Sequence, residues 1–408
     1  MSGSLGNVPV AGLGQLPVDV AAAGTSTSRP TYVYDLATLR ARCADIGRLP
    51  IRRKRVFFAS MANDHPQLIE CIKDAGHGVF VNSRKHMEIA LGAGMPPDRM
   101  LYASSNMVDE EIRTCASVGV RVVLDSVAQI RRFGLIAGPG HEVGPRVSVG
   151  FVEGDRLRDD PGYRFGVRPD ELPAAVAVAR QHEMRIVGVH SYFGTNLSAA
   201  PLVDGVGKLA DAAAILPDIA FIDAGCGFGV AMPGKPTFDF DAYASGVSAH
   251  LARLERRVRR TVEFLVEPGR YLAASCGYFF VTVVDVKERA DRVFVGTNGS
   301  VVTFPRPLIY PDHAEHPVGI IGRSPLEQPD PRPVYVSGSS TYSQDFLARG
   351  IELPLPRVGD TLVFGHAGAY CRSMMTRFLG KDEPLEVVLD RRSATTAATG
   401  TGVLAERV

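Results

Sequence analysis

The sequence has almost no net charge, because 45 lysine and arginine residues face 44 aspartate and glutamate residues. Such a balance provides no long-range field that would steer the protein to nucleic acid or to an anionic membrane. No apolar run approaches the roughly 20 residues needed to span a bilayer. The N-terminal stretch also lacks the basic start and compact apolar core of a secretory signal. We therefore expect a cytoplasmic protein with small-molecule partners, and neither nucleic acid nor membrane as a partner.

The six cysteines are scattered without the CxxC spacing of zinc sites or the pattern of a disulfide framework. No metal site is expected on this ground. We expect the six cysteines to be reduced thiols, as is usual in the cytoplasm.

The chain does have enough length and apolar content for two domains, with 408 residues of which 45% are hydrophobic. From Val56 to about Gly277, short apolar runs alternate with longer amphipathic segments. This alternation is typical of repeated βα units, and eight such strands match a (β/α)8 TIM-type barrel whose chemistry sits at the carboxyl ends of its strands. After Ser275 the sequence becomes a series of β-rich segments between Pro- and Gly-rich turns, which indicates a C-terminal β-domain.

These patterns predict five segments. They are a mobile N-terminal tail (1–29), a strand followed by a helix (30–44), the barrel (45–278), the β-domain (279–392) and a flexible C-terminal tail (393–408).

Four motifs lie in order along the chain: HSYFGTN (190–196), DAGCGFG (223–229), EPGR (267–270) and GAY (368–370). With RPLIY (306–310), their order and spacing resemble those of the diaminopimelate and ornithine decarboxylases over about residues 30 to 385. These enzymes form the alanine racemase-like, fold-type III family that depends on pyridoxal phosphate (PLP). The resemblance implies that the strand within 30–44 joins the β-domain, that the substrate is a small carboxylate-bearing molecule and that the protein is a homodimer with shared active sites.

The motifs also have chemical reasons of their own. Glycines at a strand end, here Gly225 and Gly227, let backbone N–H groups approach a phosphate closely. By resemblance, these glycines hold the phosphate of PLP, while Glu267 pairs with the pyridine nitrogen and Arg270 binds an anionic oxygen. Taken alone, the glycines could be an ordinary tight turn, and Glu267 with Arg270 a salt bridge near a turn.

The resemblance assigns further binding residues. Tyr370 matches a tyrosine near the phosphate, with Thr195 in place of a serine. Arg306 and Tyr310 match residues that hold a substrate carboxylate, which a guanidinium can bind through two hydrogen bonds. Outside this resemblance, RPLIY would be an RP turn with a buried tyrosine.

The pattern breaks where the family carries its cofactor-binding lysine. The family motif YAxKAN is FASMAN here, so Met61 stands at the lysine position. A thioether has no nucleophilic amine, so the usual internal aldimine with PLP cannot form at this residue. Lys54 precedes the strand and would face the other end of the barrel.

Other catalytic positions differ as well. Phe80 replaces an acid after the second strand, His86 replaces a glutamate, and Tyr192 replaces the histidine that stacks on the pyridine ring. Thr341 and Tyr342 stand where the family has a cysteine and an acid that reach across the dimer interface. His86 is a candidate general acid or base, although a lone histidine is more often a structural, hydrogen-bonded residue.

Two functions stay open on the sequence. The first is a decarboxylase-like enzyme that acts on an amino-acid-like or polycarboxylate substrate, with noncovalent PLP or with none. The second is a catalytically inactive homologue that serves as a ligand-binding or regulatory protein. Loss of the lysine favours the second, whereas the retained Glu267, Arg270, Arg306 and Tyr370 favour the first.

Overall fold

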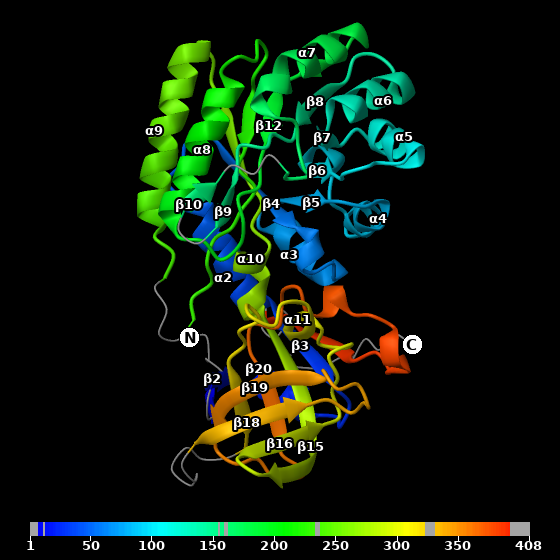
Figure 1. The fold of residues 1–408 in the computed structure, drawn as a ribbon, viewed down its shortest axis with the longest axis vertical. Coiled ribbons are helices and arrows are strands. Elements are labelled where there is room, and N and C mark those ends of the chain that lie inside the picture. Colours follow the sequence, from blue (N-terminus) through cyan, green and yellow to red (C-terminus); the bar gives the residue numbers. More distant parts are fainter. Residues whose placement is uncertain are drawn as a thin grey trace.

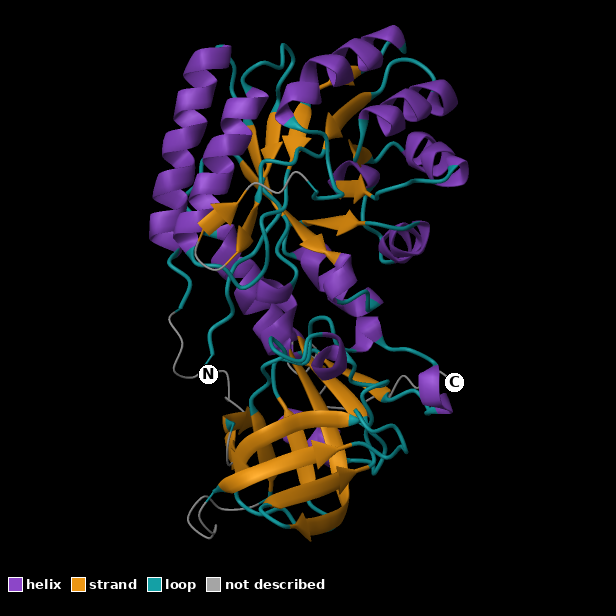
Figure 2. Cartoon of the chain, viewed as in Figure 1, coloured by secondary structure: helices purple, strands orange, loops and turns teal. Residues whose placement is uncertain are grey.

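The computed structural model describes residues 7–10, 13–153, 156–158, 162–232, 237–322 and 331–391. These residues form two domains, a barrel of strands and helices above a β-domain in the view of Figure 1, and Figure 2 separates the mixed α/β part from the part built mainly of strands. The predicted fold class, a (β/α)8 barrel followed by a β-domain, is confirmed. The expected flexible tail at 393–408 lies outside the described residues.

The barrel sheet is parallel, with the strand order β11-β8-β7-β6-β5-β4-β14-β13-β12. β11 and β12 are two halves of one strand position, because β11 pairs with β8 while β12 pairs with β13. A bridge between Arg146 and His190 closes the ring, so the described strands occupy eight positions. They are β4 (Lys54–Ala59), β5 (Gly78–Val81), β6 (Met100–Ala103), β7 (Arg121–Leu124), β8 (Glu142–Pro145), β11 (Arg185–Ile186), β12 (Gly188–His190), β13 (Phe221–Asp223) and β14 (Glu263–Val266).

Helices cover the outside of this barrel (Figure 1). α3 shows how the sequence specifies them: it begins at Pro66, where a missing N–H costs nothing, and it buries Leu68, Ile69 and Ile72 on one face. The helices are α2 (Leu36–Gly47), α3 (Pro66–Asp74), α4 (Arg84–Gly92), α5 (Asp109–Val118), α6 (Val127–Ala137), α7 (Leu172–Gln181), α8 (Ala199–Ala213), α9 (Phe240–Val258) and the short α10 (Arg270–Ala273). β9 (Phe151–Glu153) and β10 (Arg156–Arg158) form an antiparallel pair apart from the barrel sheet.

The strands are buried on both faces, as parallel strands in a barrel must be. Side chains alternate along β4, so that Phe57 and Ala59 join a cluster with Phe80 and Leu265, whereas Phe58 belongs to the larger core that includes the helices. Met61 packs against the first cluster just beyond the end of β4. The apolar interior of the barrel therefore continues up to the residue at the lysine position.

The second domain is a sheet in the order β17-β20-β15-β16-β18-β19, in which β3 also pairs with β15 and β21 pairs with β3. The pairing of β3 with β15 brings the segment around residue 33 into this domain, although it precedes the barrel in the chain. The elements are β3 (Thr31–Asp35), β15 (Gly277–Arg289), β16 (Arg292–Thr297), α11 (Arg306–Ile309), β17 (Val318–Ile321), β18 (Arg332–Ser337), β19 (Phe346–Leu353), β20 (Thr361–Phe364) and β21 (Leu385–Leu389).

The segment before residue 30 differs from the mobile tail that we expected. β1 (Asn7–Val10), β2 (Gly14–Pro17) and α1 (Val18–Thr25) pack on the β-domain and bury Val10, Leu16 and Val20. Gly24 sits so close to Phe280 that an added Cβ would lie 2.4 Å from its ring. The sequence did not indicate this contact, because Gly and Ala can pack closely but contribute little to a recognisable pattern of apolar residues.

Among the described residues, no helix combines the length and the apolar character that a bilayer crossing requires.

Candidate active site

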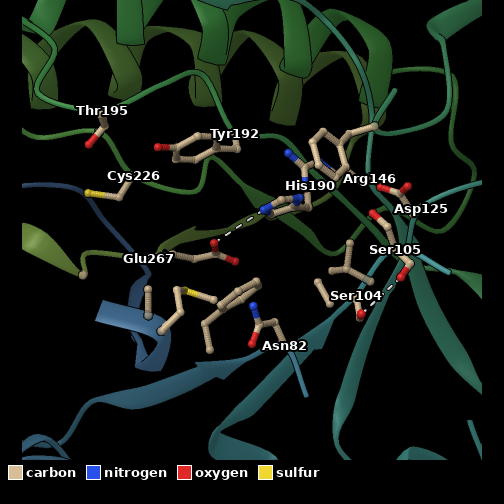
Figure 3. A pocket seen from close by; sticks show the side chains of 18 of the residues that line it. Asn82, Ser104, Ser105, Asp125, Arg146, His190, Tyr192, Thr195, Cys226 and Glu267 are labelled. Atoms are coloured by element: carbon tan, nitrogen blue, oxygen red, sulfur yellow. Dashed lines mark hydrogen bonds and ion pairs between the residues drawn. The ribbon is translucent and has the colours of Figure 1, made fainter. Parts of the chain in front are cut away.

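A cavity of about 550 Å³ lies at the carboxyl ends of the barrel strands. Side chains from the loops after nearly every strand point into it, as Figure 3 shows from close by. In barrels of this kind the loops at that end carry the chemistry. The polar side chains that line the cavity are Asn82, Ser104, Ser105, Asn106, Asp125, Arg146, Arg164, His190, Tyr192, Thr195, Cys226, Glu267, Arg270, Tyr271 and Tyr370.

The glycine-rich loop after β13 is held by close backbone contacts. A Cβ at Gly227 would lie 2.7 Å from the carbonyl oxygen of Gly194, and one at Gly225 would lie 2.9 Å from that of Ser191. Gly225 also has a φ of +54°, in the left-handed region. Gly227 and Thr195 line the cavity, whereas Gly225 does not. The loop can therefore present backbone to an anionic group at Gly227, with Gly225 shaping the turn.

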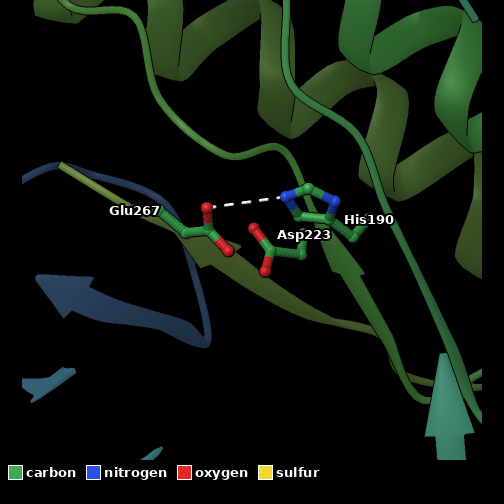
Figure 4. Close-up of side chains that lie close together, drawn as sticks. All are labelled: His190, Asp223 and Glu267. Atoms are coloured by element: carbon green, nitrogen blue, oxygen red, sulfur yellow. Dashed lines mark ion pairs between the residues drawn. The ribbon is translucent and has the colours of Figure 1, made fainter. Parts of the chain in front are cut away.

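His190, Asp223 and Glu267 form a buried cluster at the inner wall of the cavity (Figure 4). His190 Nε2 lies 3.5 Å from Glu267 Oε2, and the backbone N–H of Gly225 donates to Asp223 Oδ1 at 2.9 Å. Both ring nitrogens of His190, Asp223 Oδ2 and Glu267 Oε1 have no hydrogen-bond partner among the described residues. Buried polar atoms of this kind are typical of a site that a ligand completes.

Burial controls the protonation of this cluster. It lowers the pKa of His190 to about 4 and raises the pKa of Glu267 to about 7. Burial, followed by the nearby Glu267, raises the pKa of Asp223 well above its usual range. At neutral pH we therefore expect a neutral His190, a protonated Asp223 and a Glu267 close to its titration midpoint.

The same cluster offers two kinds of binding. One ligand atom from each residue lies within 4.8 Å of the others, which is a spacing that could hold a metal ion. Glu267 could instead accept a hydrogen bond from a protonated ring nitrogen, as the resemblance implied. The sequence had indicated no metal site, and its motifs had not marked His190 or Asp223 as candidate ligands.

Arg270 and Tyr370 lie together in the lining of the cavity. The guanidinium carbon of Arg270 is 4.7 Å from the centre of the Tyr370 ring, within the range of a cation–π contact. Tyr370 has a φ of +57°, and its N–H donates to the carbonyl oxygen of Ala62 at 2.8 Å. This bond fixes a residue that follows β20 against the loop after β4, so both domains build the site.

Met61 lines the cavity in a one-turn 3-10 helix (Ser60–Ala62). No lysine is present among the described residues that line it. Lys54 begins β4 at the opposite end of the barrel, as the sequence predicted.

Arg306 does not reach this cavity. It lines a second cavity of about 180 Å³ together with Arg270, His313 and His366. Its guanidinium is almost fully buried and donates to the carbonyl oxygen of His313 at 2.9 Å. Burial, followed by Arg270, lowers the pKa of Arg306 to about 10. Arg270 lines both cavities and so links them.

Several other predicted residues lie apart from both cavities. Tyr310 is 43% exposed and lines neither cavity. Thr341 is exposed, and Tyr342 packs edge-on against Phe378 with ring centres 5.6 Å apart. His86 bonds through Nδ1 to Asn82 Oδ1 at 2.8 Å and does not line the large cavity, although Asn82 does. Within this chain the predicted site residues thus separate into a group in the large cavity and a group outside it.

The structure adds cavity residues that sequence reasoning missed. Asp125 follows β7, Arg146 follows β8, and Ser104 and Ser105 follow β6. Each stands within two residues of a strand end. A search for polar residues at these positions in every βα unit would have found them, because strand ends meet at one rim of a barrel.

Comparisons with known proteins agree with this geometry. The family model described as "Pyridoxal-dependent decarboxylase, pyridoxal binding domain" matches residues 36–274. The diaminopimelate decarboxylase of Methanothermobacter thermautotrophicus is 29% identical over 377 residues, which cover 88% of this chain and 86% of that protein.

Among solved structures, a diaminopimelate decarboxylase that is 25% identical superposes with a TM-score of 0.83, covering 91% of each chain. The diaminopimelate decarboxylase of Helicobacter pylori, complexed with L-lysine, superposes with a TM-score of 0.80 over 90% of this chain and 92% of that one. At 22% identity the second likeness shows the fold alone.

The barrel, the β-domain and the cavity between their loops define a protein of the fold-type III class. The chain belongs to the pyridoxal-dependent decarboxylase family.

Proposed function

We propose that this chain is a decarboxylase that acts on an amino-acid-like or polycarboxylate small molecule and that binds PLP without a covalent bond to lysine. One observation carries the proposal. The cavity retains Gly227, Glu267, Arg270 and Tyr370 together, while Met61 stands at its floor and no lysine is among its described lining residues.

The residues present fit the noncovalent contacts of PLP. Gly227 and Thr195 would hold the phosphate, since close backbone and a hydroxyl are both suited to anionic oxygen. Glu267 would hold the pyridine nitrogen, because its Oε1 is buried and has no hydrogen-bond partner among the described residues. PLP, when bound, supplies a conjugated ring that takes up the electron pair released as a carboxylate leaves.

The chain's own residues would orient the substrate and keep water away. Arg270 Nε is buried without a hydrogen-bond partner in the described part of the chain, so the guanidinium keeps a donor for a carboxylate. Met61 and Phe80 form an apolar floor of the cavity. A water molecule bound there would find few hydrogen-bond partners, so this part of the cavity favours the exclusion of water. The lower dielectric strengthens the interaction of Arg270 with an anion.

A second function, a ligand-binding homologue without catalysis, is supported by another observation. Tyr342 and Thr341 lie outside the cavity of their own chain, and His86 points its Nδ1 at Asn82 instead of into the cavity. The cavity is therefore lined neither by His86, the candidate acid or base, nor by Thr341 and Tyr342 of the same chain. We propose a homodimer in which Thr341 and Tyr342 complete the partner's cavity.

Two assays test the proposal. Fluorescence titration with PLP should show saturable binding that Glu267→Gln weakens about tenfold, the loss expected when a charged hydrogen bond is removed. Carbon dioxide release should then be measured with meso-diaminopimelate, ornithine, arginine and citrate.

Carbon dioxide release that requires both PLP and Arg270 would support the proposed decarboxylase activity. Saturable PLP or substrate binding without release would favour the binding protein. Release that proceeds equally without PLP would contradict the cofactor part of the proposal.

The dimer has its own test. Arg270→Ala and Tyr342→Ala chains should each bind substrate weakly, and mixed dimers should regain one intact site. Hybrids that bind no better than their parents would contradict a shared site.

A further inference from the structure

Basic residues are concentrated in two short segments of an otherwise neutral chain. Residues 51–55 read IRRKR and residues 253–260 read RLERRVRR, so together they hold nine basic residues and one acidic residue. The whole chain holds 45 basic and 44 acidic residues, so this density does not follow from the composition. A local surplus of one charge creates a field of its own, even when the net charge of the protein is near zero.

The fold brings the two segments together at the end of the barrel opposite to the large cavity. The first segment runs into β4, and the second ends α9, on the outside of the barrel (Figure 1), shortly before β14. β4 and β14 are parallel neighbours, and the N–H of Phe264 donates to the carbonyl oxygen of Arg53 at 3.0 Å. An open groove of about 460 Å³ lies where the segments meet. We call it the arginine groove, because four arginines line it: Arg52, Arg256, Arg259 and Arg260.

Three of the four guanidinium groups in the arginine groove have no acidic partner. Arg260 forms an ion pair with Asp218 at 3.5 Å, whereas Arg52, Arg256 and Arg259 form none within the part of the chain that the structure describes. All four side chains are exposed. The groove therefore carries a surplus of positive charge that a ligand from solution can neutralise.

Two arginines of these segments stand where the backbone favours glycine. Arg259 ends α9 with a φ of +54°, and Arg53 precedes β4 with a φ of +56°. This left-handed region is unfavourable for a residue with a Cβ and open to glycine. The helix dipole accounts for a basic residue in the last turn of α9, such as Arg256. It does not account for Arg52, which lies outside that helix, or for an arginine at the left-handed position 259.

The basic surface does not continue around this end of the barrel. At the start of β14, Glu263 forms an ion pair with Arg121 at 3.2 Å, and at the start of β8, Glu142 forms one with Arg185. Inside the groove, Glu255 accepts a hydrogen bond from a backbone N–H and so holds the turn after α9. A long nucleic acid would meet these carboxylates, because its phosphates continue along the surface. The groove therefore suits a compact anion.

The number of arginines in the groove indicates how many charges that anion carries. An exposed ion pair improves affinity by at most about fivefold, so one pair alone binds weakly. A single phosphate reaches one or two guanidinium groups, whereas a chain of three phosphates can reach three or four. Each guanidinium can bind phosphate oxygens through two parallel hydrogen bonds.

We propose that the arginine groove binds a triphosphate, either free or as part of a nucleotide, through Arg52, Arg256, Arg259 and Arg260. This site goes beyond the proposed function, because it lies at the other end of the barrel. Its binding requires neither PLP nor turnover, so failure of either proposal leaves the other standing.

Calorimetry at low ionic strength tests the site, because salt screens exposed charges. The probes are inorganic phosphate, inorganic tripolyphosphate, AMP and ATP. The wild-type protein should bind tripolyphosphate at least about 20-fold more tightly than phosphate, since two more ion pairs form. ATP should exceed AMP by a similar factor. Equal affinities for ATP and tripolyphosphate would support a site for the phosphate chain alone, and a tighter ATP would support a nucleotide site.

Two variants in the groove have matched controls outside it. Arg259→Gly removes a cation and relieves its backbone, so it should weaken tripolyphosphate about fivefold without lowering the melting temperature. Arg53→Gly makes the same change at an exposed arginine that does not line the groove, and it should keep the affinity within about twofold. Arg256→Ala should also weaken binding about fivefold, whereas Arg131→Ala, at an exposed arginine of α6, should leave it unchanged.

Three calorimetric results would overturn the site. They are no preference for tripolyphosphate over phosphate, wild-type affinity in the folded Arg259→Gly and Arg256→Ala variants, or an equal loss in Arg131→Ala. A short single-stranded RNA that binds more tightly than tripolyphosphate through the same arginines would also contradict it, because the ligand would then be a polymer. Melting curves of each variant exclude a folding defect, and Arg259→Gly keeps the test valid if Arg256→Ala unfolds.

Discussion

Two walls of the same cavity differ in chemistry. The loops after β12, β13 and β14 supply close-packed glycines and the buried cluster around Glu267. The loop after β4 supplies Met61 and strand β5 supplies Phe80, and the two side chains extend the apolar interior of the barrel to the cavity floor. The first wall still offers contacts for an anion and a ring nitrogen, whereas the second offers no amine. Binding and covalent attachment can therefore be separated in one site, and each wall can be tested by itself.

The largest expected effect comes from restoring an amine to the apolar wall. Met61→Lys places an ammonium group beside Phe57 and Phe80, where burial should lower its pKa and leave a reactive neutral amine at neutral pH. With PLP and borohydride, the variant should gain a covalent adduct close to one per chain. Intact mass followed by peptide mapping would locate the adduct. A folded variant that gains no adduct at residue 61 would show that the pocket no longer admits PLP.

The next effect concerns the glycine wall. Gly227→Ala brings a Cβ to within 2.7 Å of a backbone oxygen, whereas Gly229→Ala meets its nearest atom at 3.5 Å, an ordinary contact. We expect Gly227→Ala to lower the free energy of unfolding by about 1–3 kcal/mol, the usual cost of overpacking, and to weaken PLP binding. Gly229→Ala should change both far less. Denaturant titration of the pair measures the difference, and equal effects would contradict the close approach.

A smaller effect should appear as a pH dependence of stability. Because the pKa of Glu267 is raised to about 7, its stabilising contribution is fully present below the ordinary pKa of a glutamate and is lost as pH rises through 7. Glu267→Gln cannot titrate, so its unfolding free energy should fall less between about pH 4.5 and pH 7. Parallel pH profiles of the two proteins would contradict the raised pKa.

The smallest effect is expected at His86, which lies behind Asn82 and outside the cavity. His86→Ala should change ligand affinity by less than about twofold, because it removes one hydrogen bond to a lining residue and no contact with the ligand. Asn82→Ala is the comparison variant. It removes a side chain that lines the cavity, so its effect on ligand affinity should be larger than that of His86→Ala. If His86→Ala abolished turnover while binding persisted, His86 would regain the role of acid or base that the sequence suggested.

Much of the fold could be predicted from the sequence. The alternation of apolar runs and amphipathic segments gave the barrel, because buried strands and one-sided helices have different periods. The segment before residue 30 was predicted wrongly, since its packing depends on small residues such as Gly24 that carry little apolar signal.

The site was predictable where its residues stand at strand ends. Met61, Tyr192, Thr195, Gly227, Glu267 and Arg270 all line one cavity, and they all follow barrel strands closely. Arg306 and Tyr310 could not be placed in this way, because the packing of α11 in the other domain decides where they face. Thr341 and Tyr342 lie outside the cavity of their own chain, and no spacing along one chain tests our proposal that they complete a partner's cavity.

We propose above that this cavity binds PLP without attaching it covalently. The most direct measurement is the intact mass of wild-type protein after saturation with PLP and borohydride reduction, with Met61→Lys as the positive control and free-lysine labelling assessed by peptide mapping. We predict PLP bound before reduction and no adduct on any peptide that lines the cavity, while the control gains one at residue 61. A stoichiometric adduct on a wild-type lysine that depends on Glu267 would contradict the account.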